Sequence, residues 1–180
     1  MNRTHPAILV TGFGPFLDVG DNPSGRMARQ LDGRRVVGHT VIGGSLPVSY
    51  ARGLPLMVAQ ARAISPRLVV GMGVHRGPGV RVECVARNHV GPTPDVDGAC
   101  PESLCSGPAE LTVGLKVESL IRALGGVLST DAGAYLCNAW LYTALHELKV
   151  PSVFIHIPPD FDDSTALLNG LAALVAQELT

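Results

Sequence analysis

One stretch of the sequence decides the fold around it: Ser129-Thr130-Asp131-Ala132-Gly133-Ala134-Tyr135-Leu136-Cys137-Asn138-Ala139-Trp140. The apolar residues before it predict a short strand, Asp131 and Gly133 predict a tight turn, and an apolar pattern reaching Leu148 predicts a helix. Cys137 therefore falls in or just before the first helical turn. Unpaired backbone N–H groups and the positive end of the helix dipole favour a thiolate there, so Cys137 is a candidate nucleophile. The alternative is a buried structural cysteine that behaves as a small hydrophobe.

Strands and helices alternate along the rest of the chain. Apolar runs predict strands over residues 7–11, 36–46, 67–71, 80–86, 127–128 and 152–157. Helices are predicted after the capping sequence Asn22-Pro23-Ser24 and over residues 52–63, 117–124, 141–148 and 167–179. This alternation predicts a single α/β domain over residues 1–180, an α/β/α sandwich with a mostly parallel (mixed) central sheet.

The composition restricts the class of partner. The chain has 180 residues, of which 46% are hydrophobic and 16% charged, which is typical of a globular protein with one sizeable core. A formal net charge of −1 provides no basic surface for nucleic acid or for an anionic membrane, so a small molecule or peptide is the expected partner. No apolar run approaches the roughly 20 residues of a membrane span, and no signal peptide is evident, so a cytoplasmic location is expected.

Residues 89–108 are rich in Pro, Gly and Asp and show no periodicity, which is typical of a functional or mobile loop. The loop contains Cys100 and Cys105, and Cys84, His75 and His89 precede it, so a zinc-binding module is one alternative. The C-x4-C spacing is at the edge of what zinc sites use, and no second close pair completes a ligand set. No metal is expected.

A nucleotide- or metabolite-binding α/β module is a second alternative. The turn Gly12-Phe13-Gly14-Pro15-Phe16 follows the first strand, where a glycine-rich loop can approach a pyrophosphate, and further glycines stand between residues 71 and 79. The dinucleotide fingerprint fails because Leu17 stands where a third glycine or alanine is needed. Phe13 and Phe16 would obstruct a phosphate but could enclose a small flat apolar group.

Three side chains can form a nucleophilic site. Binding sites of open α/β sheets lie outside the carboxyl ends of the strands, where we place the Gly12 turn, Cys137 and His156. Glu83 alternates with Val82 and Cys84 along its strand and can face the same place. A thiol that attacks a carbonyl needs a histidine as base and a carboxylate that orients the imidazole. The alternatives are a solvated Glu83 and a structural His156 at the end of a sheet.

Four blocks of the sequence carry a resemblance to a known family. They are Val10-Thr11-Gly12-Phe13-Gly14-Pro15-Phe16 with Asn22-Pro23-Ser24, Val82-Glu83-Cys84-Val85-Ala86-Arg87-Asn88, Asp131-Ala132-Gly133-Ala134-Tyr135-Leu136-Cys137-Asn138, and Phe154-Ile155-His156-Ile157-Pro158. In this order, and over nearly the whole chain, they resemble the signature blocks of pyroglutamyl peptidase I, the pyrrolidone carboxyl peptidase family of cysteine peptidases.

The resemblance implies a function and its residues. Cys137 would be the nucleophile, His156 the general base and acid, and Glu83 the residue that orients His156. The reaction would remove an N-terminal 5-oxoproline from a peptide through an acyl-enzyme, without cofactor or metal. The lactam pocket would comprise Phe13, Phe16, Tyr135, Leu136 and, where many members carry threonine, Val48. The resemblance also implies a homo-oligomer, a dimer or tetramer. A catalytically degenerate member of the family is the alternative.

Overall fold

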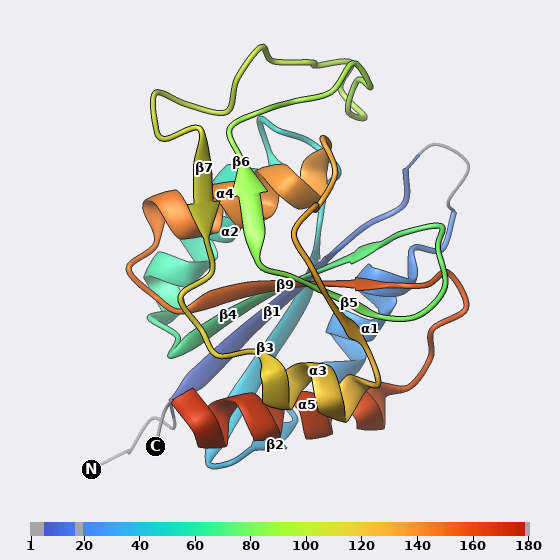
Figure 1. The fold of residues 1–180 in the computed structure, drawn as a ribbon, viewed down its shortest axis with the longest axis vertical. Coiled ribbons are helices and arrows are strands. Elements are labelled where there is room, and N and C mark those ends of the chain that lie inside the picture. Colours follow the sequence, from blue (N-terminus) through green and yellow to red (C-terminus); the bar gives the residue numbers. More distant parts are fainter. Residues whose placement is uncertain (1–5, 17–19, 179–180) are drawn as a thin grey trace.

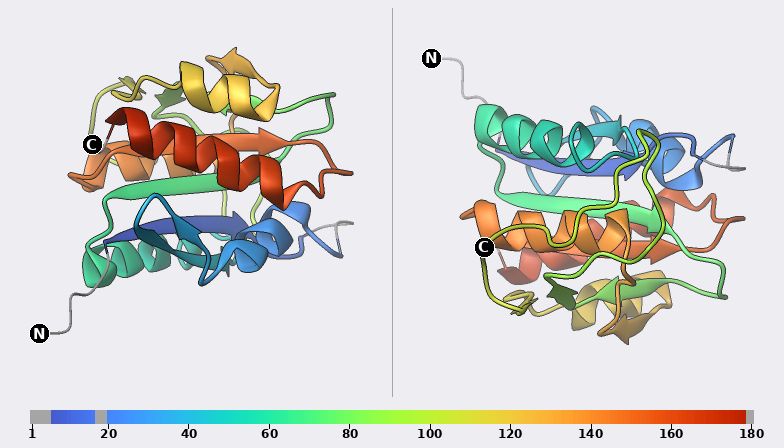
Figure 2. Two further views of the ribbon diagram at one scale, coloured as in Figure 1. Left: turned by 90° about the horizontal axis from the view of Figure 1, so that it is seen from below. Right: turned by 90° about the horizontal axis from the view of Figure 1, so that it is seen from above.

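The computed structural model of the chain describes residues 6–16 and 20–178. Within them, seven strands form one sheet between two layers of helices (Figures 1 and 2). In pairing order the strands are β2 (Arg35–Val36), β3 (His39–Leu46), β1 (Ala7–Phe13), β4 (Leu68–Val74), β9 (Ser152–Ile157), β5 (Arg81–Glu83) and β8 (Val127–Ser129). Strands β3, β1, β4 and β9 are mutually parallel. Strand β2 pairs antiparallel with β3, β5 pairs antiparallel with β9, and β8 pairs parallel with β5. The predicted mixed, mostly parallel sheet is confirmed.

The helices cover both faces of this sheet (Figure 2). Helices α2 (Gly53–Ile64) and α4 (Leu136–Glu147) pack together on one face. Helices α1 (Pro23–Leu31), α3 (Glu118–Leu124) and α5 (Ser164–Glu178) pack on the other. Because the central strands are covered on both faces, they must be apolar along their whole length, which explains the continuous runs in the sequence. Ile8 of β1 and Ile155 of β9, for example, are both 0% exposed.

Two of the predicted strands are each divided in the structure. The predicted strand over residues 36–46 forms the hairpin of β2 and β3, because Val37 and Gly38 adopt positive φ angles of 46° and 79°. The predicted strand over residues 80–86 divides at Cys84 into β5 and β6 (Val85–Arg87). The backbone N–H of Cys84 donates to the carbonyl of Ser129, the last residue of β8, whereas the Cys84 carbonyl accepts from the Val113 N–H. The chain therefore leaves the central sheet at this residue.

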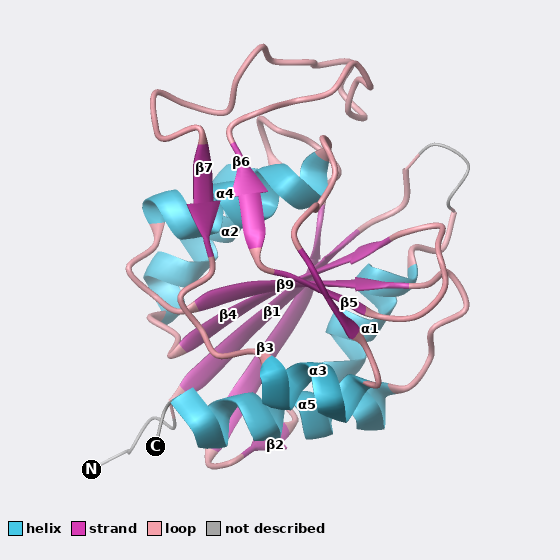
Figure 3. Cartoon of the chain, in the orientation of Figure 1, coloured by secondary structure: helices cyan, strands magenta, loops and turns pink. Residues whose placement is uncertain are grey.

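Strand β6 then pairs antiparallel with β7 (Glu110–Thr112), a strand that the sequence analysis did not predict. This small hairpin packs against α4, and the predicted long loop connects its two strands (Figure 3). In the part of the chain that the structure describes, none of the helices combines the length and apolar character needed to cross a membrane.

Candidate active site

The turn after β1 is fastened to the first turn of α1. The Ser24 hydroxyl accepts a hydrogen bond from the Phe13 N–H at 3.1 Å, and the Asn22 amide donates to the Gly14 carbonyl at 3.0 Å. The Asn22 Oδ1 also accepts from the Ser24 N–H at 3.1 Å, which confirms the predicted helix cap. A Cβ on Gly12 would lie only 2.1 Å from the Ser24 carbonyl oxygen, so this glycine allows the helix to approach the strand. Packing therefore accounts for the glycine that had suggested a nucleotide site.

Cys137 is the second residue of α4, as predicted. Tyr135 occupies the N-cap position in an extended conformation, and its side chain makes no capping hydrogen bond to the helix. The predicted turn before the helix is also present, because Gly133 has a φ of 81° and donates its N–H to Asp131 at 3.0 Å. The cysteine is half-buried and lies beside helical N–H groups that no side chain caps.

The route that brings Cys137 to the site differs from the prediction. Strand β8 runs antiparallel to β9, so the carboxyl ends of these two strands lie at opposite edges of the sheet. The segment of residues 130–135 instead leads back across the sheet to the first turn of α4 (Figure 1). It delivers Cys137 to β4, because a Cβ on Gly73 would lie 2.6 Å from the Cys137 sulfur. Gly73 is in turn the register partner of His156 on β9.

Gly73 therefore makes room for the sulfur, and we predict that Gly73→Ala displaces it. The added methyl group would also lie 2.9 Å from the Phe154 ring, so both neighbours must move. Overpacking of this kind destabilises a core by about 1–3 kcal/mol. We expect a lower free energy of unfolding in urea and slower alkylation of Cys137 by iodoacetamide. Gly44→Ala is the matched control, because no atom lies within 4 Å of its added Cβ. Equal alkylation rates in both variants would contradict the assigned role of Gly73.

His156 and Glu83 form a buried pair. The His156 Nδ1 donates to the Glu83 Oε1 at 2.8 Å, and the two residues are 7% and 0% exposed. Glu83 is therefore not a solvated strand residue, which was its alternative interpretation. Because Nδ1 is engaged, the imidazole has only Nε2 left for a second partner. The Glu83 Oε2 has no hydrogen-bond partner among the described residues.

Cys137 interacts with the same imidazole. Burial lowers the pKa of His156, but charge and hydrogen-bond interactions with Cys137 and Glu83 outweigh it and raise this pKa from 6.5 to about 10. The Phe154 ring lies edge-on at 5.1 Å between ring centroids, and the His75 ring lies at 5.8 Å. A sulfur, an imidazole and a carboxylate from three separate elements thus lie in series, and the imidazole contacts two further rings.

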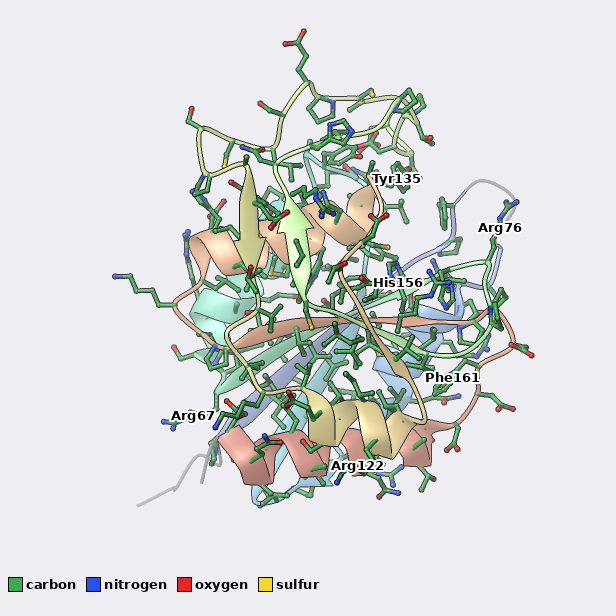
Figure 4. All side chains as sticks on the ribbon, viewed as in Figure 1. Arg67, Arg76, Arg122, Tyr135, His156 and Phe161 are labelled. Carbon is green, nitrogen blue, oxygen red and sulfur yellow. The ribbon has the colours of Figure 1, made fainter. Side chains whose placement is uncertain are left out.

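Aromatic side chains lie beside the cysteine. The rings of Phe16 and Tyr135 have centroids 6.1 Å apart, and the Tyr50 ring meets Tyr135 edge-on, also at 6.1 Å. Phe16 and Tyr135 are half-buried, so both keep accessible surface. Figure 4 shows Tyr135 and His156 in the same region of the molecule, whereas Arg67 lies at the opposite end of the sheet. The other three predicted pocket residues are buried: Phe13 (4% exposed), Val48 (2%) and Leu136 (1%).

The long loop is fastened to these elements at several points. The Tyr135 hydroxyl donates to the Pro94 carbonyl at 3.0 Å, and the Val96 N–H donates to the Val48 carbonyl at 3.1 Å. Asp95 is buried and accepts hydrogen bonds from the backbone N–H groups of Tyr50, Asp97 and Ala99. The loop thereby connects the predicted pocket residues of α4 with those that follow β3.

Asn138 is a residue whose role the sequence analysis missed, although it stands in one of the four blocks. Its side chain is 1% exposed, accepts from the Arg87 N–H, and donates to the carbonyls of Arg87 and His89. It therefore joins the first turn of α4 to the start of the long loop. The sequence offered one signal for this role: an asparagine stands directly after the predicted nucleophile, in a buried position of a helix. A buried amide requires hydrogen-bond partners.

The two loop cysteines considered for zinc have different partners. Cys105 contacts His146 at 3.8 Å, whereas the Cys100 thiol donates to the Gly91 carbonyl at 3.1 Å. Within residues 6–16 and 20–178, no group of three or more His, Cys, Asp or Glu side chains is arranged to hold a metal ion.

The chain is similar to known proteins over most of its length. The family model described as pyroglutamyl peptidase matches residues 6–161. The pyrrolidone-carboxylate peptidase of Halalkalibacterium halodurans is 33% identical, over 96% of this chain and 93% of that protein. The protein of the same name from Klebsiella pneumoniae is 34% identical, over 84% of this chain and 77% of that protein.

Solved structures show the same fold. A mutant pyrrolidone carboxyl peptidase from Pyrococcus furiosus superposes with a TM-score of 0.84 at 25% identity, covering 96% of this chain and 98% of that one. Pyroglutamyl peptidase I of Bacillus amyloliquefaciens has a TM-score of 0.88 over 95% and 97% of the two chains, and at 22% identity this likeness concerns the fold alone. Because the family model matches residues 6–161 of this chain and relatives are a third identical to it, the chain belongs to the pyroglutamyl peptidase family of cysteine peptidases.

Proposed function

We propose that the protein hydrolyses the peptide bond after an N-terminal pyroglutamyl (5-oxoproline) residue, with Cys137 as nucleophile, His156 as general base and acid, and Glu83 as the residue that orients His156. The observation that carries the proposal is the buried hydrogen bond between His156 and Glu83, on an imidazole that also interacts with Cys137. This series of partners is what an activated thiol requires.

The proposed reaction proceeds through an acyl-enzyme. The Cys137 thiolate attacks the exocyclic carbonyl carbon of the pyroglutamyl residue, and the carbonyl becomes an oxyanion. The uncapped N–H groups in the first turn of α4 would stabilise this charge. The C–N bond then breaks as His156 donates a proton to the departing amine, which leaves a thioester. Water transfers a proton to His156 and attacks the thioester, which releases pyroglutamate and regenerates the thiolate.

The lactam ring is proposed to bind between Phe16 and Tyr135, the two accessible aromatic rings of the pocket. Phe13, Val48 and Leu136 would form the buried apolar wall behind them. A flat, uncharged ring suits such walls, whereas the α-ammonium group and carboxylate of an N-terminal glutamate would lose their hydration without compensation. The pocket would thereby select pyroglutamyl over glutamyl peptides.

The test compares arylamides of pyroglutamate, proline and glutamate as substrates of the purified protein. We expect the arylamine to be released from the pyroglutamyl compound alone, and expect prior treatment with iodoacetamide to abolish release. Equal turnover of the glutamyl compound would refute the proposed pocket. An absence of turnover with all three compounds would favour a degenerate member of the family.

We further propose that the protein forms a homo-oligomer, a dimer or tetramer, and acts in the cytoplasm, where a catalytic thiol stays reduced. Strand β8 forms one edge of the sheet and exposes Val127 (58%) and Leu128 (54%), an apolar edge suited to pairing with a second copy. All four cysteines of the sequence are free. We expect light scattering to give a multiple of the 18.8 kDa chain mass, and Leu128→Lys to reduce it. A monomeric wild-type protein would contradict the oligomer.

A further inference from the structure

The order of the strands indicates where the two parts of the proposed substrate lie, the pyroglutamyl ring and the leaving peptide. The predicted lactam pocket lies at the ends of β1 and β3, Cys137 lies against β4, and His156 is on β9. Because His156 donates a proton to the departing amine, the leaving peptide must lie on the His156 side of the sulfur. The next strand in this direction is β5, so residues of β5 and of the β4–β5 connection border the path of the leaving peptide.

Arg81 of β5 lies on this path. It is the register partner of His156 in the antiparallel pair of β5 and β9, so the two side chains project from the same face of the sheet. Its guanidinium extends to the β4–β5 connection, where a Cβ on Gly77 would lie 2.8 Å from one of its nitrogens. The side chain is half-buried, and no carboxylate among the described residues forms an ion pair with it. A partly desolvated, unpaired guanidinium is a site for a carboxylate of a ligand.

The connection that Arg81 reaches also holds His75 beside the imidazole. The His75 Nδ1 accepts a hydrogen bond from the Gly77 N–H at 3.0 Å, so Nε2 carries the ring proton and donates to the Gly79 carbonyl at 2.8 Å. These two hydrogen bonds hold the His75 ring against His156. Arg76 is exposed on the same connection and adds positive charge at its outer side (Figure 4).

We propose that Arg81 binds a carboxylate of the leaving peptide, so that the enzyme prefers pyroglutamyl substrates with an acidic group just after the cleaved bond. The proposal rests on the proposed function and adds a determinant of specificity to it. Arg81 does not act on the reacting atoms: its guanidinium recognises the portion of the substrate that departs. The carboxylate can come from an acidic side chain or from the carboxyl terminus of a dipeptide, two sources with one chemistry.

Two pairs of substrates distinguish a side-chain carboxylate from a terminal one. Pyroglutamyl-glutamate amide against pyroglutamyl-glutamine amide tests the side chain, and pyroglutamyl-glutamine against its amide tests the terminus. In at least one pair we expect kcat/KM of the wild type to favour the acidic member roughly five- to tenfold, the effect of one charge-assisted hydrogen bond in a partly exposed site. The preference should decrease as salt is raised. Arg81→Gln should abolish it while turnover of the neutral peptides stays near wild type, and Arg81→Lys should retain part of it.

Arg67→Gln is the matched control, because it removes the same charge at the opposite end of the sheet (Figure 4). It should leave the preference unchanged. Equal kcat/KM within both pairs in the wild type, or a preference that survives in Arg81→Gln, would overturn the proposal and leave the proposed function intact. If no pyroglutamyl peptide is hydrolysed, the proposed function fails instead. Calorimetric binding of the same peptides to Cys137→Ala then decides the role of Arg81 without turnover, since equal affinities within both pairs would exclude it.

Discussion

Replacing Cys137 with alanine is expected to lower kcat for a pyroglutamyl arylamide by at least about ten-thousand-fold, because no other group can form the thioester. The sulfur lies where helical N–H groups, the His156 imidazole and the space above Gly73 meet. Serine at this position should restore little of the activity, since a hydroxyl ionises far less readily than a thiol. The measurement is steady-state release of arylamine, with mass spectrometry of a rapidly quenched reaction to detect the acylated wild-type enzyme.

Cys100→Ala is the matched control for this substitution. Cys100 is exposed in the long loop and donates a single hydrogen bond, so its loss should leave kcat within about twofold of wild type, as is usual for surface changes. Binding of pyroglutamate to Cys137→Ala should still raise its Tm, because the pocket remains intact. If Cys137→Ala kept more than a tenth of the wild-type activity, Cys137 would not be the nucleophile.

Glu83→Gln is expected to lower kcat by about 10²- to 10⁴-fold, the range for groups that orient and charge a catalytic imidazole. The amide keeps the shape of the carboxylate but removes the negative charge that faces His156. It also places an NH2 group where Oε2 has no partner among the described residues, which costs about 1–3 kcal/mol of stability. A loss of stability alone would lower the amount of folded enzyme without altering its pH dependence, so the pH profile distinguishes the two effects.

The pH profile follows from the raised pKa of His156. Burial lowers this pKa, and Cys137 and Glu83 raise it to about 10, so the folded enzyme keeps His156 protonated until the pH rises through that value. Activity should therefore fall on the alkaline side as the imidazolium is lost. Glu83→Gln removes one of the groups that raise the pKa, so its alkaline limb should move to lower pH.

The same shift affects stability. The folded pKa of His156 is higher than the ordinary value of 6.5, so its contribution to the free energy of unfolding is complete below pH 6.5 and is lost as pH rises through about 10. Urea titrations across this range should show a steeper decline for wild type than for Glu83→Gln. Glu102→Gln, which changes an exposed carboxylate of the long loop, is the control. Identical alkaline limbs in wild type and Glu83→Gln would contradict the orienting role of Glu83.

Local patterns were sufficient for the elements that carry the site. The strand predicted at residues 152–157 is β9, and the turn and helix predicted around Cys137 are present because Gly133 and the apolar pattern after it impose them locally. The Asn22 cap is likewise a property of neighbouring residues. Strand pairing was less predictable: Cys84 divides one predicted strand because its N–H and carbonyl pair with segments distant in the chain.

By itself, the sequence determined that this is an α/β protein and that Cys137 opens a helix, because strand and helix periodicity and turn residues act over a few neighbouring positions. Only the tertiary structure decided that residues 130–135 lead back across the sheet, that Gly73 accommodates the sulfur, and that Glu83 is buried against His156. The tertiary structure alone also places Arg81 opposite His156. These contacts join residues that are far apart in the chain. The direction and register of β5, β8 and β9 determine which residues meet, and no local pattern specifies that direction or register.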